Sequence, residues 1–135
     1  MKITILCVGK IKETYFSGAI KEYSKRLSRY CKLNIIEIPD EKTPDGASDH
    51  LMNQIKDKEG ERLLKNFPVH AYVIALAIEG KKLSSEKLAE KMNGLGIQGE
   101  SHLVFVIGGS LGLSKAVLDR ADYLLSFSHM TFPHQ

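Results

Sequence analysis

The sequence predicts an α/β domain built on a mostly parallel sheet with helices on both faces. Short apolar segments alternate with helical or turn-rich segments along the chain, an order typical of parallel crossover connections. The apolar segments are almost continuously hydrophobic, which indicates strands that are buried on both sides. A length of 135 residues suits one domain, so we expect residues 1–135 to form a single unit.

The first strand and the first helix follow from the N-terminal segment. Residues 2–9 read KITILCVG, a short β-branched apolar run that ends on a glycine, which favours a buried strand. Between residues 13 and 30 the apolar side chains recur every three or four positions, which predicts a helix with one apolar face and basic residues on the other. That apolar face consists of Tyr15, Phe16, Ala19, Ile20, Tyr23, Leu27 and Tyr30.

A second strand and a second helix are expected next. Residues 32–39 read KLNIIEIP, a strand that a proline stops, and the turn-rich residues 40–49 follow it. A helix is then expected over about residues 48–66, although Gly60 in its middle costs about 1 kcal/mol relative to alanine. Its inward side chains are expected to be Leu51, Ile55, Leu63 and Leu64.

Three strands and two helices complete the chain. The strands are expected at residues 71–78, 102–109 and 123–130. A helix capped by Ser84 or Ser85 separates the first two of these strands and ends in a glycine-rich stretch. A short helix, SKAVLDRA, precedes the last strand.

Composition and cysteine content set the broad class of protein. Hydrophobic residues make up 43% of the chain and charged residues 26%, which is ordinary for a globular protein. We found no run of roughly 18 apolar residues and no secretory signal, so we expect a soluble cytoplasmic protein without a membrane partner. Cys7 and Cys31 lack C-x-x-C spacing and are expected to be reduced core thiols.

Charges of opposite sign are separated along the first half of the chain. Basic residues predominate up to residue 32, whereas residues 37–61 are mainly acidic. A basic face can attract the phosphates of a nucleic acid, but it can also be an ordinary solvated helix face. The basic stripe consists of Lys10, Lys12, Lys21, Lys25, Arg26, Arg29 and Lys32.

Three segments are expected to meet at one edge of the sheet. In parallel α/β sheets ligands bind beyond the carboxyl ends of the strands, where LAIEG, IGGSLG and SFSHMTF are predicted to lie. Gly108, Gly109 and Gly112 would let the backbone turn tightly and approach a ligand. The spacing fits neither a dinucleotide fingerprint nor a P-loop, so a ligand-binding loop and a simple tight turn both remain open.

The remaining candidate chemical groups are histidines and a cysteine. The five histidines have no spacing typical of metal ligands, so no metal site is predicted. His129 and His134 could bind or orient a ligand near the C-terminus, or be polar residues at a strand end. Covalent catalysis has no support, because Cys7 lies in a predicted core strand with no activating group nearby in the sequence.

Several segments together resemble the RlmH family, also called YbeA or OrfX, of SPOUT-class ribosomal RNA methyltransferases. The resemblance covers essentially all of the chain, and the glycine loop and the C-terminal segment carry most of its specificity. The segments that carry it are MKITILCVGKIKETY, YSKRL, IPDEK, KEGERLL, FVIGGSLGL and LSFSHMTFPHQ.

The resemblance implies a homodimeric α/β knot that uses S-adenosylmethionine to methylate N3 of a pseudouridine in 23S ribosomal RNA of the assembled ribosome. It implies direct methyl transfer without a protein nucleophile; no catalytic base is assigned, and His129 is only a candidate. It also favours the basic stripe as an RNA contact, at Lys25, Arg26 and Arg29. By position, the implied cofactor-binding residues are Leu76, Gly108, Phe127, Ser128, His129, Met130, Thr131 and Phe132.

The resemblance also implies a departure from the family pattern at the C-terminus. Family members continue past TFPHQ with a final helix and a short basic tail, so a C-terminally truncated chain with an incomplete knot is expected. Two interpretations therefore stay open: an active methyltransferase, and a catalytically silent form that folds and retains cofactor or RNA binding. A flavodoxin-like phosphate-binding module, suggested by the glycine loop alone, is a third.

Overall fold

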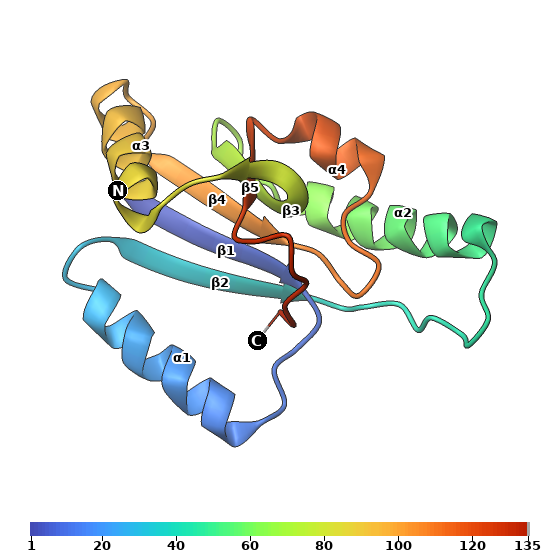
Figure 1. The fold of residues 1–135 in the computed structure, drawn as a ribbon. Helices are drawn as coiled ribbons and strands as arrows, with labels where there is room; N and C mark the ends of the chain where they lie inside the picture. The colour runs from blue at the N-terminus through green and yellow to red at the C-terminus, as the bar shows by residue number, and fades with distance from the viewer. Residues whose placement is uncertain (135) are drawn as a thin grey trace.

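A computed structural model describes residues 1–134, in which strands and helices alternate as the sequence predicts (Figure 1). Serine side chains cap three of the helices: Ser48, Ser84 and Ser114 each accept a hydrogen bond from the backbone N–H three residues on. The elements are β1 (Lys2–Val8), α1 (Thr14–Leu27), β2 (Lys32–Ile38), α2 (Asp49–Lys65), β3 (Tyr72–Lys82), α3 (Ser85–Ile97), β4 (His102–Ile107), α4 (Lys115–Arg120) and β5 (Tyr123–Ser126).

The strands form one parallel sheet in the order β2-β1-β4-β3-β5. The central strand β4 lies between β1 and β3, and its side chains Leu103, Val104 and Val106 are all at 0% exposure. The predicted parallel sheet is therefore confirmed, and the carboxyl ends of all five strands lie at one edge.

Helices α2 and α4 cover one face of the sheet. Leu6 and Val8 of β1 alternate along the strand and point to this face, where they meet Leu63 of α2 and Val117 of α4. The main hydrophobic core therefore lies between the sheet and these two helices. It also contains Ile38, Ala71, Val73, Ala75, Val104, Val106 and Leu113.

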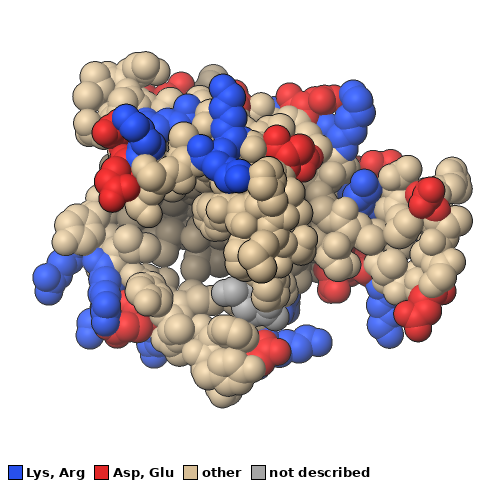
Figure 2. Space-filling model, viewed as in Figure 1, with Lys and Arg blue, Asp and Glu red and all other residues tan. Residues whose placement is uncertain are grey.

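Helices α1 and α3 lie on the opposite face and cover it incompletely. Lys91 of α3 lies over the Tyr123 ring, 3.9 Å from its centroid. Helix α1 borders an open groove whose other wall includes Leu33 and Ile35 of β2, and Ile35 remains 38% exposed. Figure 2 shows the molecule hollowed between the body of the protein and α1, which lies at the bottom of the view. Helices on both faces are thus confirmed, but burial differs between the two faces.

The apolar face predicted for the first helix does not point into the core. Helix α1 contains no buried residue, and Tyr15 and Tyr23 are 70% and 63% exposed. The periodicity located the helix correctly, yet tyrosine has a polar end and is often exposed, so its spacing alone does not show that a helix face is buried. Cys31 beyond this helix is likewise only partly buried, whereas Cys7 is buried as predicted.

Strand β3 is longer than predicted and returns to β5 after an irregular segment. Leu76 and Lys81 both pair with Leu125, so residues 77–80 leave the ladder and the chain then rejoins it. At Gly80 the chain passes directly against the backbone of β5, and a Cβ there would lie 2.7 Å from the carbonyl carbon and oxygen of Leu124. Figure 1 shows this segment arching over β5 toward α3. Only glycine permits so close an approach.

Strand β5 is shorter than predicted, because its second half forms a turn. The Ser126 hydroxyl donates a hydrogen bond to the Ser128 carbonyl oxygen at 2.9 Å, and the Ser128 hydroxyl accepts one from the Met130 backbone N–H at 3.0 Å. Serine side chains of this kind compete with the strand ladder for backbone groups. The chain therefore leaves the sheet at Ser126.

Candidate functional site

The predicted cofactor residues come together at the carboxyl edge of three neighbouring strands. Ala75 of β3 pairs with Val106 of β4, and Leu76 pairs with Leu125 of β5. Gly108 directly follows β4, and Phe127 directly follows β5. The register therefore places Leu76, Gly108 and the segment after β5 side by side, as the sequence predicts for a ligand site.

The glycine loop after β4 is a closed, compact turn. The Gly112 N–H donates to the Gly109 carbonyl oxygen at 3.0 Å, and the two residues form an isolated antiparallel bridge. A Cβ on Gly108 would lie 2.9 Å from the carbonyl of Gly112, and Gly112 itself has a φ of 87°. These glycines are therefore required by the loop's own geometry, which satisfies the tight-turn interpretation and also leaves backbone exposed at the edge.

Large apolar side chains of the C-terminal segment face solvent at this edge. Phe127, Met130 and Phe132 are 68%, 70% and 59% exposed. His129 and Thr131 are exposed too, whereas Ser128 is half-buried in its turn. Exposed apolar side chains next to backbone hydrogen-bonding groups suit a ligand that is partly flat and apolar and partly polar.

The C-terminal segment extends from β5 to the end of β1. His134 lies against Gly9, where a Cβ would be 3.7 Å from both Cε1 and Nε2 of its ring. The His134 Nε2 atom is buried and has no hydrogen-bond partner among residues 1–134. The edge thus includes the end of β1 as well as the three predicted segments, and it offers an unused polar atom there.

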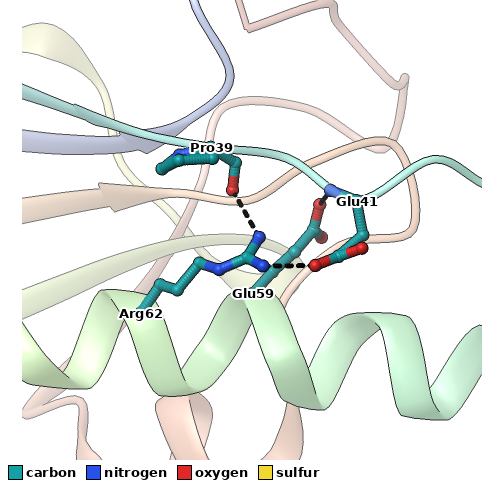
Figure 3. A network of polar contacts seen from close by, with 4 residues as sticks. All are labelled: Pro39, Glu41, Glu59 and Arg62. Carbon is teal, nitrogen blue, oxygen red and sulfur yellow. Dashed lines mark hydrogen bonds and ion pairs between the residues drawn. The ribbon is translucent and has the colours of Figure 1, made fainter.

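A polar network below this edge was missed by the sequence reasoning. Glu59 of α2 is only 4% exposed, and its Oε2 atom accepts a hydrogen bond from the Glu41 N–H at 3.0 Å. Arg62, one turn further along α2, donates to the Pro39 carbonyl oxygen at 3.0 Å and forms an ion pair with Glu41 (Figure 3). A signal was present in the sequence, because Glu59 falls on the helical stripe between Ile55 and Leu63.

The environment of Glu59 changes its proton affinity. Burial raises the pKa of Glu59, because the charged form loses solvation. The hydrogen bond from the Glu41 backbone and the charge of Arg62 lower that pKa, but the carboxylates of Asp40 and Glu41 raise it, and the net direction is upward. Glu59 is therefore a buried acid held between opposing charges.

The predicted RNA-binding residues lie away from this edge. Helix α1 starts beyond the carboxyl end of β1 and ends before β2, whose first residue pairs with Lys2 at the amino edge of the sheet. Lys25, Arg26 and Arg29 lie at or just beyond the last turn of α1, toward the amino edge of the sheet and so away from the predicted cofactor residues. Figure 2 shows basic side chains at the lower left, over the end of α1. Arg26 of α1 pairs with Glu22 at 3.0 Å.

The part of the chain that the structure describes gives little support for a metal site, for a second cofactor pocket or for a membrane-spanning helix. No group of three or more histidine, cysteine or acidic side chains there could hold a metal ion. Two hollows in the described surface, one beside α1 and β2 and one between α2 and α4, are lined by none of the predicted cofactor residues. None of the described helices has the length and apolar character to cross a membrane.

Comparison with known proteins gives matches along the whole chain. A family model described as "Predicted SPOUT methyltransferase" matches residues 1–135. A Bifidobacterium adolescentis protein named ribosomal RNA large subunit methyltransferase H is 66% identical over 135 residues, all of this chain and 85% of that protein. Proteins of the same name from Clostridium novyi and Clostridium tetani are 62% and 61% identical, with the same coverage.

Proposed function

This chain belongs to the SPOUT methyltransferase family, and we propose that it transfers a methyl group from S-adenosylmethionine to N3 of a pseudouridine in 23S ribosomal RNA of the assembled ribosome. Its relatives, at 61% to 66% identity, carry the name of a large-subunit ribosomal RNA methyltransferase, which makes it an enzyme acting on ribosomal RNA. The observation that carries the proposal is the meeting of Leu76, the glycine loop and residues 127–132 at one edge. Since the proposed substrate is the ribosome, we also propose that the protein acts in the cytoplasm.

The residues at the edge suit this cofactor. Bound there, S-adenosylmethionine supplies an electrophilic methyl group. Leu76, Phe127 and Met130 would contact its apolar parts and exclude water, while backbone groups around Gly108 and Ser128 would bind its polar parts. The unpartnered Nε2 of His134 and the exposed Thr131, His129 and Phe132 lie along the same segment.

The protein's chemical task is then alignment and proton removal. The substrate nitrogen must lie in line with the transferred methyl group and lose its proton, so the protein contributes by orienting the reactants and by accepting or directing the proton. His129 is the candidate group for accepting or directing that proton, since it is exposed at the edge among the cofactor residues. Its replacement by alanine should lower kcat more than cofactor affinity.

The RNA contact is proposed at the end of α1. Lys25, Arg26 and Arg29 are exposed at or just beyond the end of α1, where Figure 2 shows basic side chains. Each phosphate contact made by such a group releases counterions and makes binding salt-dependent. Their place toward the amino edge of the sheet, away from the cofactor residues, suits a contact with a large RNA surface rather than with the target base itself. Alanine at all three positions should weaken ribosome binding and flatten its salt dependence, whereas alanine at the exposed Lys87 and Lys115 on other helices should not.

A homodimer is proposed as the functional state. Phe127, Met130 and Phe132 leave apolar surface exposed beside the cofactor residues, and a second copy could cover it. Sedimentation of the protein over a concentration range tests this. A protein that binds the cofactor tightly as a monomer would contradict a pocket completed by the partner.

Radiolabelled methyl transfer tests the proposed function directly. The substrate is ribosomes from cells lacking the modification, with modified ribosomes as the control, and the labelled product is located in the 23S RNA by nuclease digestion. Calorimetric titration with S-adenosylmethionine is run on the same protein. Cofactor binding without transfer would favour the catalytically silent form, and flavin binding in place of S-adenosylmethionine would favour the phosphate-binding alternative.

A further inference from the structure

The carboxylate of Glu59 lies directly beneath the glycine loop. A Cβ added to Gly109 would be 3.0 Å from Oε1 and 3.2 Å from Oε2 of Glu59, and also 3.2 Å from Val8. The carboxylate therefore touches the backbone at the start of the loop, in a space that any side chain at position 109 would fill. A buried carboxylate is costly unless it makes compensating contacts, so its place on the apolar stripe of α2 needs a reason.

The next residue of α2 touches the other end of the same loop. A Cβ on Gly60 would be 2.2 Å from the Ser114 Oγ atom and 3.0 Å from its Cβ. The Ser114 hydroxyl accepts a hydrogen bond from the Val117 N–H at 3.3 Å and so caps α4. Two consecutive residues of α2 thus contact both ends of the segment between Gly109 and Ser114.

The same carboxylate also binds the segment that follows β2. The Glu41 N–H donates to Oε2 of Glu59 at 3.0 Å, and Arg62 fixes the neighbouring Pro39 and the Glu41 side chain (Figure 3). Arg62 contacts only this segment in that network, whereas Glu59 contacts both it and the glycine loop. Glu59 is therefore the residue through which α2 links the two segments.

We propose that Glu59 is a positioning residue for cofactor binding, which fixes the glycine loop after β4 in its binding conformation by joining it to α2 and to the segment after β2. The inference rests on the proposed function, since it assigns the cofactor to the loop that contains Gly108. An acceptor at position 59 is required because the Glu41 N–H would otherwise lack its hydrogen-bond partner in a partly buried position.

Three variants separate positioning from general stability. Glu59→Ala removes the acceptor and the contact with the loop, whereas Glu59→Gln keeps a side-chain carbonyl oxygen of the same reach. Thr4→Val is the matched control, because it removes a partly buried hydrogen bond between Thr4 Oγ1 and His102 Nε2, 2.8 Å apart, near the opposite edge of the sheet. The free energy of unfolding is measured for all three by urea denaturation.

The first readout is made without cofactor. Hydrogen exchange of the backbone amides between residues 108 and 114 should become about tenfold faster or more in Glu59→Ala, remain near wild type in Glu59→Gln, and not change in Thr4→Val beyond any change in global stability. Unchanged exchange of these amides in Glu59→Ala would overturn the proposal. This result does not depend on whether the loop binds S-adenosylmethionine.

The second readout is the affinity for S-adenosylmethionine by calorimetry, with steady-state kinetics. Glu59→Ala should raise Kd and the cofactor KM by about tenfold while leaving kcat at saturating cofactor within about threefold, and Glu59→Gln should restore most of the affinity. Equal affinities in Glu59→Ala and Thr4→Val would overturn the positioning role. Faster exchange in the loop together with no S-adenosylmethionine binding by the wild type would instead contradict the proposed function and leave the structural link intact.

Discussion

Replacing Gly80 with alanine tests the close crossing between β3 and β5. The added Cβ would lie 2.7 Å from the carbonyl carbon and oxygen of Leu124 and 2.9 Å from the carbonyl carbon of Leu125. All three are backbone atoms, so the contact is relieved only if the backbone of β5 or of the segment carrying Gly80 moves, and Leu125 of β5 is only 1% exposed. Overpacking costs about 1–3 kcal/mol. We expect the upper value, about 3 kcal/mol, because no flexible side chain can give way.

Urea denaturation followed by far-ultraviolet circular dichroism measures this loss. The midpoint should fall with an unchanged slope, and the melting temperature should fall by about 10 °C. Gly94→Ala is the matched control, since a Cβ at this site in α3 meets nothing within 4 Å; it should stabilise the protein by up to about 1 kcal/mol. If Gly80→Ala unfolds with the free energy of the wild type, the crossing does not have the geometry described.

Three further predictions use the same denaturation assay. Gly60→Ala should lower the free energy of unfolding by about 1–2 kcal/mol, because its Cβ would lie 2.2 Å from Ser114 Oγ, although alanine ordinarily favours a helix interior. Burial raises the pKa of Glu59, so the folded wild type binds this proton more tightly than the unfolded chain and loses stability as pH rises from about 4.3 through the raised value. Glu59→Gln should lack that loss, and its stability relative to wild type should therefore increase with pH over that range. Burial and Lys2 lower the pKa of His102, so the wild type should lose stability as pH falls below about 6.5, and His102→Gln should show a flatter profile.

The strands, their parallel direction and the carboxyl edge could be predicted because they depend on short-range patterns. Continuous apolar runs such as residues 102–107 fix the parallel strands, and parallel strands fix the edge at which their following loops meet. This rule places the segments that contain Leu76, Gly108 and Phe127 together, whereas the choice of these residues as cofactor contacts comes from the family resemblance. The prediction needed no long-range contact, only the direction of each strand.

The features that the sequence did not reveal depend on tertiary contacts. Tyr23 is exposed because an open groove separates part of α1 from the sheet. The spacing of apolar residues predicts the helix but not its distance from the sheet. The end of β5 at Ser126 follows from two serine hydrogen bonds that compete with the ladder, and the extension of β3 follows from a return to Leu125 after four residues outside it. In each case the local pattern fits more than one arrangement, and a neighbouring segment determines which one forms.

Two residues of α2 that conflict with a stable helix packed on an apolar core are those that connect it to the glycine loop and to the segment after β2. Gly60 weakens the helix by about 1 kcal/mol, and Glu59 puts a charge on a stripe whose neighbours Ile55 and Leu63 are in the core. A helix chosen for its own stability and for packing on the core would have alanine at position 60 and leucine at position 59. That helix would collide with Ser114 and would leave the Glu41 N–H without its acceptor. The reduced stability of α2 is therefore coupled to the close approach of the glycine loop. Positions such as 59 and 60, where the residue conflicts with its own helix, indicate which part of the fold supports the candidate site.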